Sequence, residues 1–425
     1  MAAWGQPSVW GSQMCVRWQQ KKGKGFPIEA SRSTSIITSS STTSVASSTM
    51  LSSGVSSKGF LMGPFQEGKL SQPSWTGDEP LSRLVSALIS IKPLFALMSL
   101  GARQVLIGSA EKNGVPWRKL SEECLASDVY AEKDLLEDKS VIYPDYYVKN
   151  FHCYPDGNLS WKAASEVEAA TSSMIIRAIP KAKNLEEAIK VLRGNWLRAI
   201  EDYHLVHSGN PEIRDILDVG CSVGISTRCL ADTFPSAQVT GLDLSPYFVA
   251  VAQHKDKKEA AAGKRREKPI HWVHALGENT GLRAQSFDIV SLAYVIHECP
   301  QDATKGLLKE AFRLLRPGGT VALTDNSPKS KIIQNLPPPL FTLMKASEPW
   351  MDEYYSMDLE GLMYEVGFTN VKSQLTDPRH RTATGSLSNL QFRGEPSLLI
   401  IMYRGTSLLI VDMKWSNASE GLAPQ

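Results

Sequence analysis

Short apolar runs alternate with helix-like stretches between residues 213 and 324, and this alternation constrains the fold more than any other feature. The apolar runs cover residues 213–219, 237–242, 271–275, 287–293 and 320–324. Helical patterns stand between them at 225–234, 247–258 and 303–315. Strands that are separated by helices need crossover connections, which produce a parallel sheet covered on both faces. We therefore expect an α/β fold with a doubly wound sheet.

Flanking regions extend this core in both directions. Residues 77–195 have helical periodicity and predict a helical N-terminal region or cap. After a helix at 358–366, apolar runs at 371–375 and 398–403 have no helix between them and should pair antiparallel at an edge. The expected sheet is seven-stranded and mostly parallel, with a late antiparallel edge strand. The tail at 405–425 has no evident place in this fold, and its structure is unclear from the sequence.

The amino-acid composition argues against several classes of protein. The chain has 425 residues, with 46 Lys plus Arg against 44 Asp plus Glu, and its net charge is +2. This balance argues against a protein that coats nucleic acid. The six cysteines include no CxxC pair, which argues against a disulfide scaffold or a cysteine zinc site.

The first 70 residues have the composition of a targeting segment. Residues 1–66 contain one acidic side chain, Glu29, against six basic ones, and 18 of the 27 residues at 31–57 are Ser or Thr. No early apolar run suits a secretory signal. We expect a disordered transit peptide over 1–70 and delivery to the chloroplast, in the stroma or at a thylakoid or plastoglobule surface. Residues 84–100 predict an amphipathic helix, so peripheral membrane contact stays an alternative.

A glycine turn follows the first apolar run and carries the strongest chemical signal. The run ends in Asp218-x-Gly220-x-Ser222-x-Gly224, where a helix begins. Such a turn lets the backbone approach a ligand beside a helix N-terminus. Asp243 ends the next run, where a carboxylate can accept both hydroxyls of a ribose. Together they indicate an adenosine ligand.

Dinucleotide binding is the rival interpretation of this turn. It expects Gly-x-Gly-x-x-Gly and a pyrophosphate on the helix. Here Ser222 stands between the two glycines, and the charge of Asp218 would repel a pyrophosphate. A ligand with an amine and a sulfonium suits this site better, which points to S-adenosylmethionine.

Five segments in order resemble the class I S-adenosylmethionine-dependent methyltransferases, especially the ubiquinone/menaquinone-type branch. They are LDVGCSVGIST (217–227), VTGLDLS (239–245), SFDIVSLAYVIHE (286–298), LLRPGGTVALTD (314–325) and LEGLMYEVGFTNV (359–371). The resemblance implies a Rossmann-like methyltransferase domain over 196–404 with S-adenosylmethionine as cofactor. Together with the leader and residues 91–117, the whole chain resembles plant plastid proteins that carry this domain.

The same resemblance assigns cofactor-binding roles to particular residues. Gly220 and Gly224 match the close-approach glycines, with Ser222 in place of a middle glycine. Asp218 matches the acid near the methionine amine, and a helix-capping role is its alternative. Asp243, followed by Leu244, matches the ribose ligand.

Two further positions concern the adenine and the end of the fourth strand. Leu276 stands where the family often has an Asp for the adenine amino group, so Glu278 or backbone groups would replace it. By the same resemblance, Tyr294 matches the strand-end residue of the family that lines the cofactor or the substrate.

Catalytic and metal-binding candidates are few. His297 is a candidate general base for an acidic hydroxyl, and a structural histidine is its alternative. The Asn/Asp-Pro-Pro-Tyr box that serves methylation of nucleic-acid amines is absent after the fourth strand. HxxH pairs occur at His204/His207 and His271/His274 without third ligands, so the sequence predicts no metal site.

Two aromatic segments are candidates to cover the acceptor. One runs from Tyr143 to Trp161, and its alternative role is a satellite core under a loop. The other is the insertion at 331–355, which we expect to close the acceptor side with Trp350. Aromatic walls favour a small apolar or aromatic acceptor. The sequence thus predicts a small-molecule methyltransferase, with a protein or RNA methyltransferase and a non-catalytic cofactor-binding relative as alternatives, and leaves the oligomeric state open.

Overall fold

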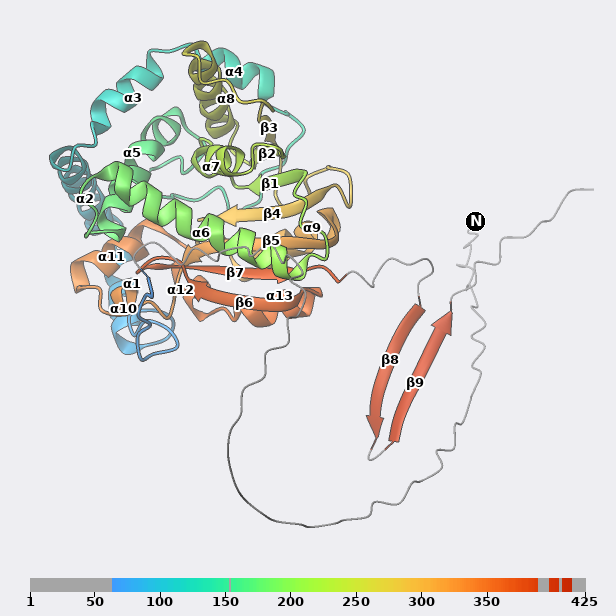
Figure 1. The fold of residues 1–425 in the computed structure, drawn as a ribbon. Coiled ribbons are helices and arrows are strands. Elements are labelled where there is room, and N and C mark those ends of the chain that lie inside the picture. The colour runs from blue at the N-terminus through green and yellow to red at the C-terminus, as the bar shows by residue number, and fades with distance from the viewer. Residues whose placement is uncertain (1–62, 153, 389–396, 405–406, 415–425) are drawn as a thin grey trace, which may run out of the picture. The chain divides into compact units, whose positions relative to one another are not determined.

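A seven-stranded sheet forms the centre of the fold in the computed structural model (Figure 1). The model describes residues 63–152, 154–388, 397–404 and 407–414. The strand order is β3-β2-β1-β4-β5-β7-β6, and all pairs from β3 to β5 are parallel. The strands are β1 (Asp215–Val219), β2 (Gln238–Asp243), β3 (His271–His274), β4 (Phe287–Ala293), β5 (Leu315–Asn326), β6 (Thr369–Leu375) and β7 (His380–Ser386). The chain reverses its order between β1 and β4, which makes this sheet doubly wound, as expected.

Helices cover both faces and supply the N-terminal region. Before the sheet come α1 (Pro80–Ile89), α2 (Lys92–Lys112), α3 (Trp117–Leu125), α4 (Val129–Leu136), α5 (Trp161–Ala178) and α6 (Leu185–His207). Within the sheet region come α7 (Ile225–Thr233), α8 (Pro246–Ala261), the 3-10 turn η1 (Ile296–Glu298), α9 (Gln301–Leu314), α10 (Lys331–Gln334), α11 (Pro338–Ser347), α12 (Met351–Ser356) and α13 (Leu359–Val366). The helical N-terminal region is confirmed as helical in the part that the structure describes.

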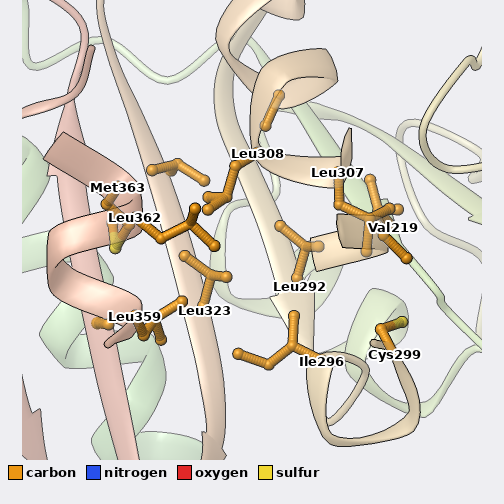
Figure 2. Packing of buried hydrophobic residues seen from close by; sticks show 14 of the residues in the cluster. Val219, Leu292, Ile296, Cys299, Leu307, Leu308, Leu323, Leu359, Leu362 and Met363 are labelled. Carbon is orange, nitrogen blue, oxygen red and sulfur yellow. The ribbon is translucent and has the colours of Figure 1, made fainter. Parts of the chain in front are cut away.

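Alternate residues of the strands feed two separate cores. Val219, Leu292 and Leu323 point to the face covered by α9 and α13 (Figure 2). Ile216 in β1 and Ile289 in β4 belong to the core on the other face, where α6 and α7 pack. This period of two fixes the face of the sheet on which each side chain packs. Because β1 to β5 run parallel, their carboxyl ends lie at the same edge of the sheet.

The late strands differ from the sequence prediction in one respect. The expectation that 398–403 completes the sheet is wrong, because β7 pairs antiparallel with both β5 and β6. The β7 segment, HRTATGS, has no apolar run and reads as a turn from sequence, yet all seven residues are buried. Its buried threonines are hydrogen bonded, as between Thr324 and Thr382 at 2.9 Å. Satisfied hydroxyls make such a polar strand tolerable inside a sheet.

A separate hairpin holds the segment that was expected at the edge. Strand β8 (Ser397–Arg404) pairs antiparallel with β9 (Ser407–Lys414). The sequence leaves the structure of the tail at 405–425 unclear, and within it residues 407–414 form β9. The sheet domain belongs to a compact unit over 57–391, and the hairpin belongs to a different one.

The expected transit peptide falls mostly outside the described residues, which begin at 63. Part of its predicted C-terminal end is nevertheless folded: Gly68 donates its N–H to the Lys329 carbonyl at 2.7 Å. Trp75 is buried and stacks on Phe341 at 5.3 Å. The folded domain thus starts before residue 70. Among the described helices, none has the length and apolarity that a membrane span requires.

Candidate cofactor and acceptor site

The turn after β1 is built around two glycines with left-handed backbone conformations. Gly220 has φ +69° and Gly224 has φ +79°, which disfavour any side chain. A Cβ on Gly220 would lie 2.4 Å from Cγ2 of Val295, and one on Gly224 would lie 2.3 Å from Cη2 of Trp272. Both glycines are therefore required by backbone shape and by packing, independently of any ligand.

Asp218 lies beneath this turn and is fully buried. Its Oδ2 accepts hydrogen bonds of 2.7 Å from Ser226 Oγ and Thr227 Oγ1 in the first turn of α7. Burial raises the pKa of Asp218, and these hydroxyls oppose that rise. Its Oδ1 has no hydrogen-bond partner. One oxygen thus ties the loop to the helix, and the other is available to a ligand or a water.

Asp243 ends β2 beside the same turn. Its Oδ2 accepts the Ser222 N–H at 2.7 Å, and its Oδ1 accepts the Ser245 N–H at 2.8 Å. Burial raises the pKa of Asp243 to about 7, although the two N–H donors lower it. Each oxygen retains a second lone pair. The adjacent Leu244 is buried, and its carbonyl lies 3.0 Å from His274 Nε2.

Tyr294 follows β4 with an unusual backbone. Its φ is +63°, a conformation that non-glycine residues seldom adopt outside functional sites and turns. Its N–H donates to the Thr324 carbonyl at 2.7 Å, but its hydroxyl is buried without a partner. The Ser222 hydroxyl is likewise buried and unpartnered.

Arg193 of α6 is a site residue that the sequence did not reveal. It is 4% exposed, and its guanidinium lies over the Tyr294 ring at 5.3 Å. Its charge lowers the pKa of Asp218, while its Nε and Nη1 have no partner. In the sequence Arg193 is one charged residue among several in a helical stretch, and only the tertiary fold shows that it is buried beside Tyr294.

The residues after β3 do not supply the missing adenine Asp. Leu276 is partly buried and forms a β-bridge with Asn279. Glu278 accepts a hydrogen bond from the Tyr146 hydroxyl, and its pKa is raised by burial. Glu278 is therefore near the site but engaged by the N-terminal region.

His297 lies in η1, shortly after the end of β4. Its Nδ1 lies 2.8 Å from Oδ1 of Asp325, the penultimate residue of β5. Burial would lower the pKa of His297, but the charge of Asp325 outweighs it and raises the pKa to about 10. The imidazole is thus mainly charged near neutral pH. This disfavours proton abstraction as long as the ion pair with Asp325 is intact.

The two aromatic segments join over the carboxyl ends of the strands. From the N-terminal one, Tyr143 lies 3.4 Å from His274, and Asn158 donates to Glu298 at 2.8 Å. The insertion contacts it through Trp350, whose Nε1 donates to the Tyr146 carbonyl at 3.3 Å. The segment 143–161 therefore contacts the insertion at these strand ends, as a cap would. Tyr154 also packs in a small core with Ala163 and Phe248, as the alternative expects. Other insertion aromatics, Phe341 and Tyr355, serve packing on Trp75.

His204 and His274, from the two HxxH pairs, form hydrogen bonds within the fold. Nδ1 of His204 lies 2.9 Å from the Thr320 hydroxyl, and Nδ1 of His274 accepts the Asp138 N–H at 3.0 Å. A different group comes together beside the cap: His152, His297, Glu298 and Glu348. Sequence spacing cannot reveal it, since its members come from three distant segments.

Comparisons with known proteins agree with this geometry. Residues 217–323 match the family model described as a methyltransferase domain. The demethylmenaquinone methyltransferase of Lactococcus lactis is 34% identical over 113 residues, 26% of this chain and 42% of that protein. An uncharacterized methyltransferase of Synechocystis is 28% identical over 184 residues, 43% of this chain and 77% of that protein. The chain thus spans less than half of the Lactococcus protein.

A solved structure of phosphoethanolamine N-methyltransferase 2 from Haemonchus contortus, in complex with S-adenosylmethionine, is also similar. It shares 15% identity with a TM-score of 0.38, over 59% of this chain and 61% of that chain. The matched residues 217–323 contain the glycine turn, the end of β2 and the end of β4. Residues 217–323 of this chain therefore match a methyltransferase domain and are similar to S-adenosylmethionine-dependent methyltransferases.

Proposed function

We propose that this protein transfers a methyl group from S-adenosylmethionine to a small apolar or aromatic acceptor in the plastid. The carboxylate of Asp243 carries the proposal. It is buried at the end of β2 and held at 2.7 Å by the N–H of Ser222, within the glycine turn. Ligands of doubly wound sheets bind at such strand ends, beside the point where the strand order reverses.

The residues around this carboxylate fit the chemical groups of the cofactor. The remaining lone pairs of Asp243 suit two ribose hydroxyls. The unpartnered Oδ1 of Asp218 suits the methionine amine, directly or through water. The unpartnered guanidinium atoms of Arg193 suit the methionine carboxylate. Burial makes each of these charged groups expensive without such a ligand.

S-adenosylmethionine supplies a methyl group on a sulfonium, which an acceptor displaces in line. The protein's part is to align the two molecules and to exclude water. Tyr294 and His297 lie where an acceptor would meet the methyl group. The cap formed by 143–161 and 331–355 would close over it, with the aromatic rings of Tyr146 and Trp350 as apolar wall.

The proposed class of acceptor rests on the aromatic side chains of the cap and on the names of similar proteins. One similar protein is named for a quinone precursor and another, from Pneumocystis carinii, for a sterol. Both acceptors are apolar small molecules, which the aromatic cap would suit. Plastid delivery rests on the composition of residues 1–62.

The direct test uses S-adenosylmethionine with an isotopically labelled methyl group and a lipid-soluble plastid extract. The proposal predicts label in the small-molecule fraction with wild-type protein and none with Asp243→Ala. Label in protein or RNA fractions would favour a macromolecular acceptor. Cofactor binding without any labelled product would favour the non-catalytic alternative.

A further inference from the structure

Four side chains beside the cap converge in a way that neither packing nor cofactor binding requires. His152, His297, Glu298 and Glu348 each offer one ligand atom, and these atoms all lie within 4.8 Å of one another. His152 comes from the N-terminal aromatic segment, His297 and Glu298 from η1, and Glu348 from the end of α11. Residues that are up to 196 positions apart in the chain, 152 and 348, therefore meet at one point.

The spacing of these atoms suits a metal ion. Nε2 of His152 lies 3.4 Å from Oε1 of Glu298 and 3.2 Å from Oε1 of Glu348. Ligands bonded at about 2.0–2.2 Å to one ion lie roughly 3–4 Å from each other. Small side-chain movements would thus bring these atoms into one coordination sphere.

One atom of the cluster lacks any partner within the protein. Glu348 is 7% exposed, and its Oε2 is buried without a hydrogen bond. An unpaired buried carboxylate oxygen costs several kcal/mol unless a cation or a donor meets it. The cluster therefore has a ligand set and one buried carboxylate oxygen that no group in the described part of the chain meets.

Neighbouring residues orient the proposed ligands through hydrogen bonds, as is common around metal sites. Asp325 engages Nδ1 of His297 at 2.8 Å and leaves Nε2 as the other ring nitrogen, whose proton a bound metal ion would displace. Carboxylates commonly orient metal-binding histidines in this manner. Asn158 donates to Oε2 of Glu298 at 2.8 Å and leaves Oε1 facing the cluster.

An ion could reach this point from solvent. The side chain of His152 is 39% exposed, whereas that of Glu348 is 8% exposed. The N–H of His152 donates to the Ser347 carbonyl at 2.9 Å, which fixes the exposed member beside the buried one. Entry would therefore pass over His152.

We propose that His152, His297, Glu298 and Glu348 bind a divalent first-row transition metal ion. Two imidazoles with two carboxylates favour Zn²⁺, Mn²⁺ or Fe²⁺ over Mg²⁺ or Ca²⁺, which prefer oxygen ligands alone. Asp325 is a positioning residue for His297. Bound there, the ion would polarise an oxygen of the acceptor. This role rests on the proposed methyl transfer, whereas the binding of the ion does not depend on it.

Co²⁺ is the probe, because its visible absorption reports coordination geometry. Full-length protein without an affinity tag is treated with chelator and titrated with CoCl₂, followed by absorption and by calorimetry. The proposal predicts one ion per chain and a visible band. His152→Gln and Glu348→Gln should each weaken binding at least tenfold, and Asp325→Asn about 10–100-fold.

Two controls separate the metal site from other effects. His271→Gln removes an exposed histidine of β3 and should leave Co²⁺ binding unchanged. Circular dichroism of each variant excludes unfolding, and His152→Gln is the safest variant because its side chain reaches solvent. Absence of the band, or the same affinity in wild type, His152→Gln and Glu348→Gln, would overturn the proposal. Titration of the same samples with S-adenosylmethionine tests the cofactor site separately, so the two proposals can fail independently.

Discussion

The Ser222 N–H donates a 2.7 Å hydrogen bond to Oδ2 of Asp243, which joins the turn after β1 to the end of β2. The second oxygen of the carboxylate accepts the N–H of Ser245. Asp243 therefore has a fixed orientation before any ligand binds. Such preorganisation lowers the entropic cost of binding.

The pH dependence of cofactor affinity follows from this burial. Burial raises the pKa of Asp243 from 3.8 to about 7 in the ligand-free protein. The ribose hydroxyls donate to the ionised form, so affinity for S-adenosylmethionine should rise with pH up to about 7 and level off above it. Calorimetry between pH 5.5 and 8.5 checks this, and Asp243→Asn should flatten the profile. An affinity that falls over this range would contradict the assignment.

The same group also predicts a stability trend in the ligand-free protein. A folded-state pKa above the unfolded value means that the folded state binds more protons. The contribution of Asp243 to stability is therefore fully present below about pH 4 and is lost as the pH rises toward 7. Denaturation of wild type and Asp243→Asn should show a difference that changes with pH in this window.

Arg193→Met tests the proposed partner of the methionine carboxylate. Loss of charge-assisted hydrogen bonds of about 1.5–3 kcal/mol should lower affinity for S-adenosylmethionine roughly 10–100-fold. Affinity for 5′-methylthioadenosine, which has no carboxylate, should stay within about twofold of wild type. An equal loss for both ligands would show that the substitution disturbs the site generally.

Much of this architecture is predictable from sequence, because β1, β2, β4 and most of β5 are short, largely apolar runs that are buried on both faces of the sheet. Strand β7 is not, because its buried residues are mainly polar and satisfied only by tertiary hydrogen bonds. Asp218, Asp243 and the glycines are recognisable from their spacing along one segment. Arg193 and the cluster with Glu348 are not, because distant segments meet only in the folded chain.

Trp350→Ala tests how the two cap segments hold together. Its indole donates to the Tyr146 carbonyl at 3.3 Å, so its removal should increase hydrogen exchange across 143–158. Donor affinity should remain within about twofold, a difference under ~0.5 kcal/mol. Trp350→Phe keeps the apolar ring without the N–H and should give an intermediate effect. If hydrogen exchange across 143–158 is unchanged in Trp350→Ala, then contacts other than Trp350 hold the two segments together.

The leader makes a prediction in cells. Residues 1–62 fused to a fluorescent protein should carry it into plastids, because this segment is basic, rich in Ser and Thr and poor in acids. Replacing its six basic residues by Gln should leave the reporter in the cytosol. Diffuse signal from the unmodified fusion would contradict plastid delivery.

Calorimetric titration of S-adenosylmethionine into wild type, Asp243→Ala and Asp302→Ala measures the cofactor site most directly. Asp302 is an exposed acid in the first turn of α9 and serves as the matched control. We predict one cofactor per chain, an affinity at least tenfold lower in Asp243→Ala, and wild-type affinity in Asp302→Ala. No binding by wild type, or the same affinity in wild type and Asp243→Ala, would contradict the site described here.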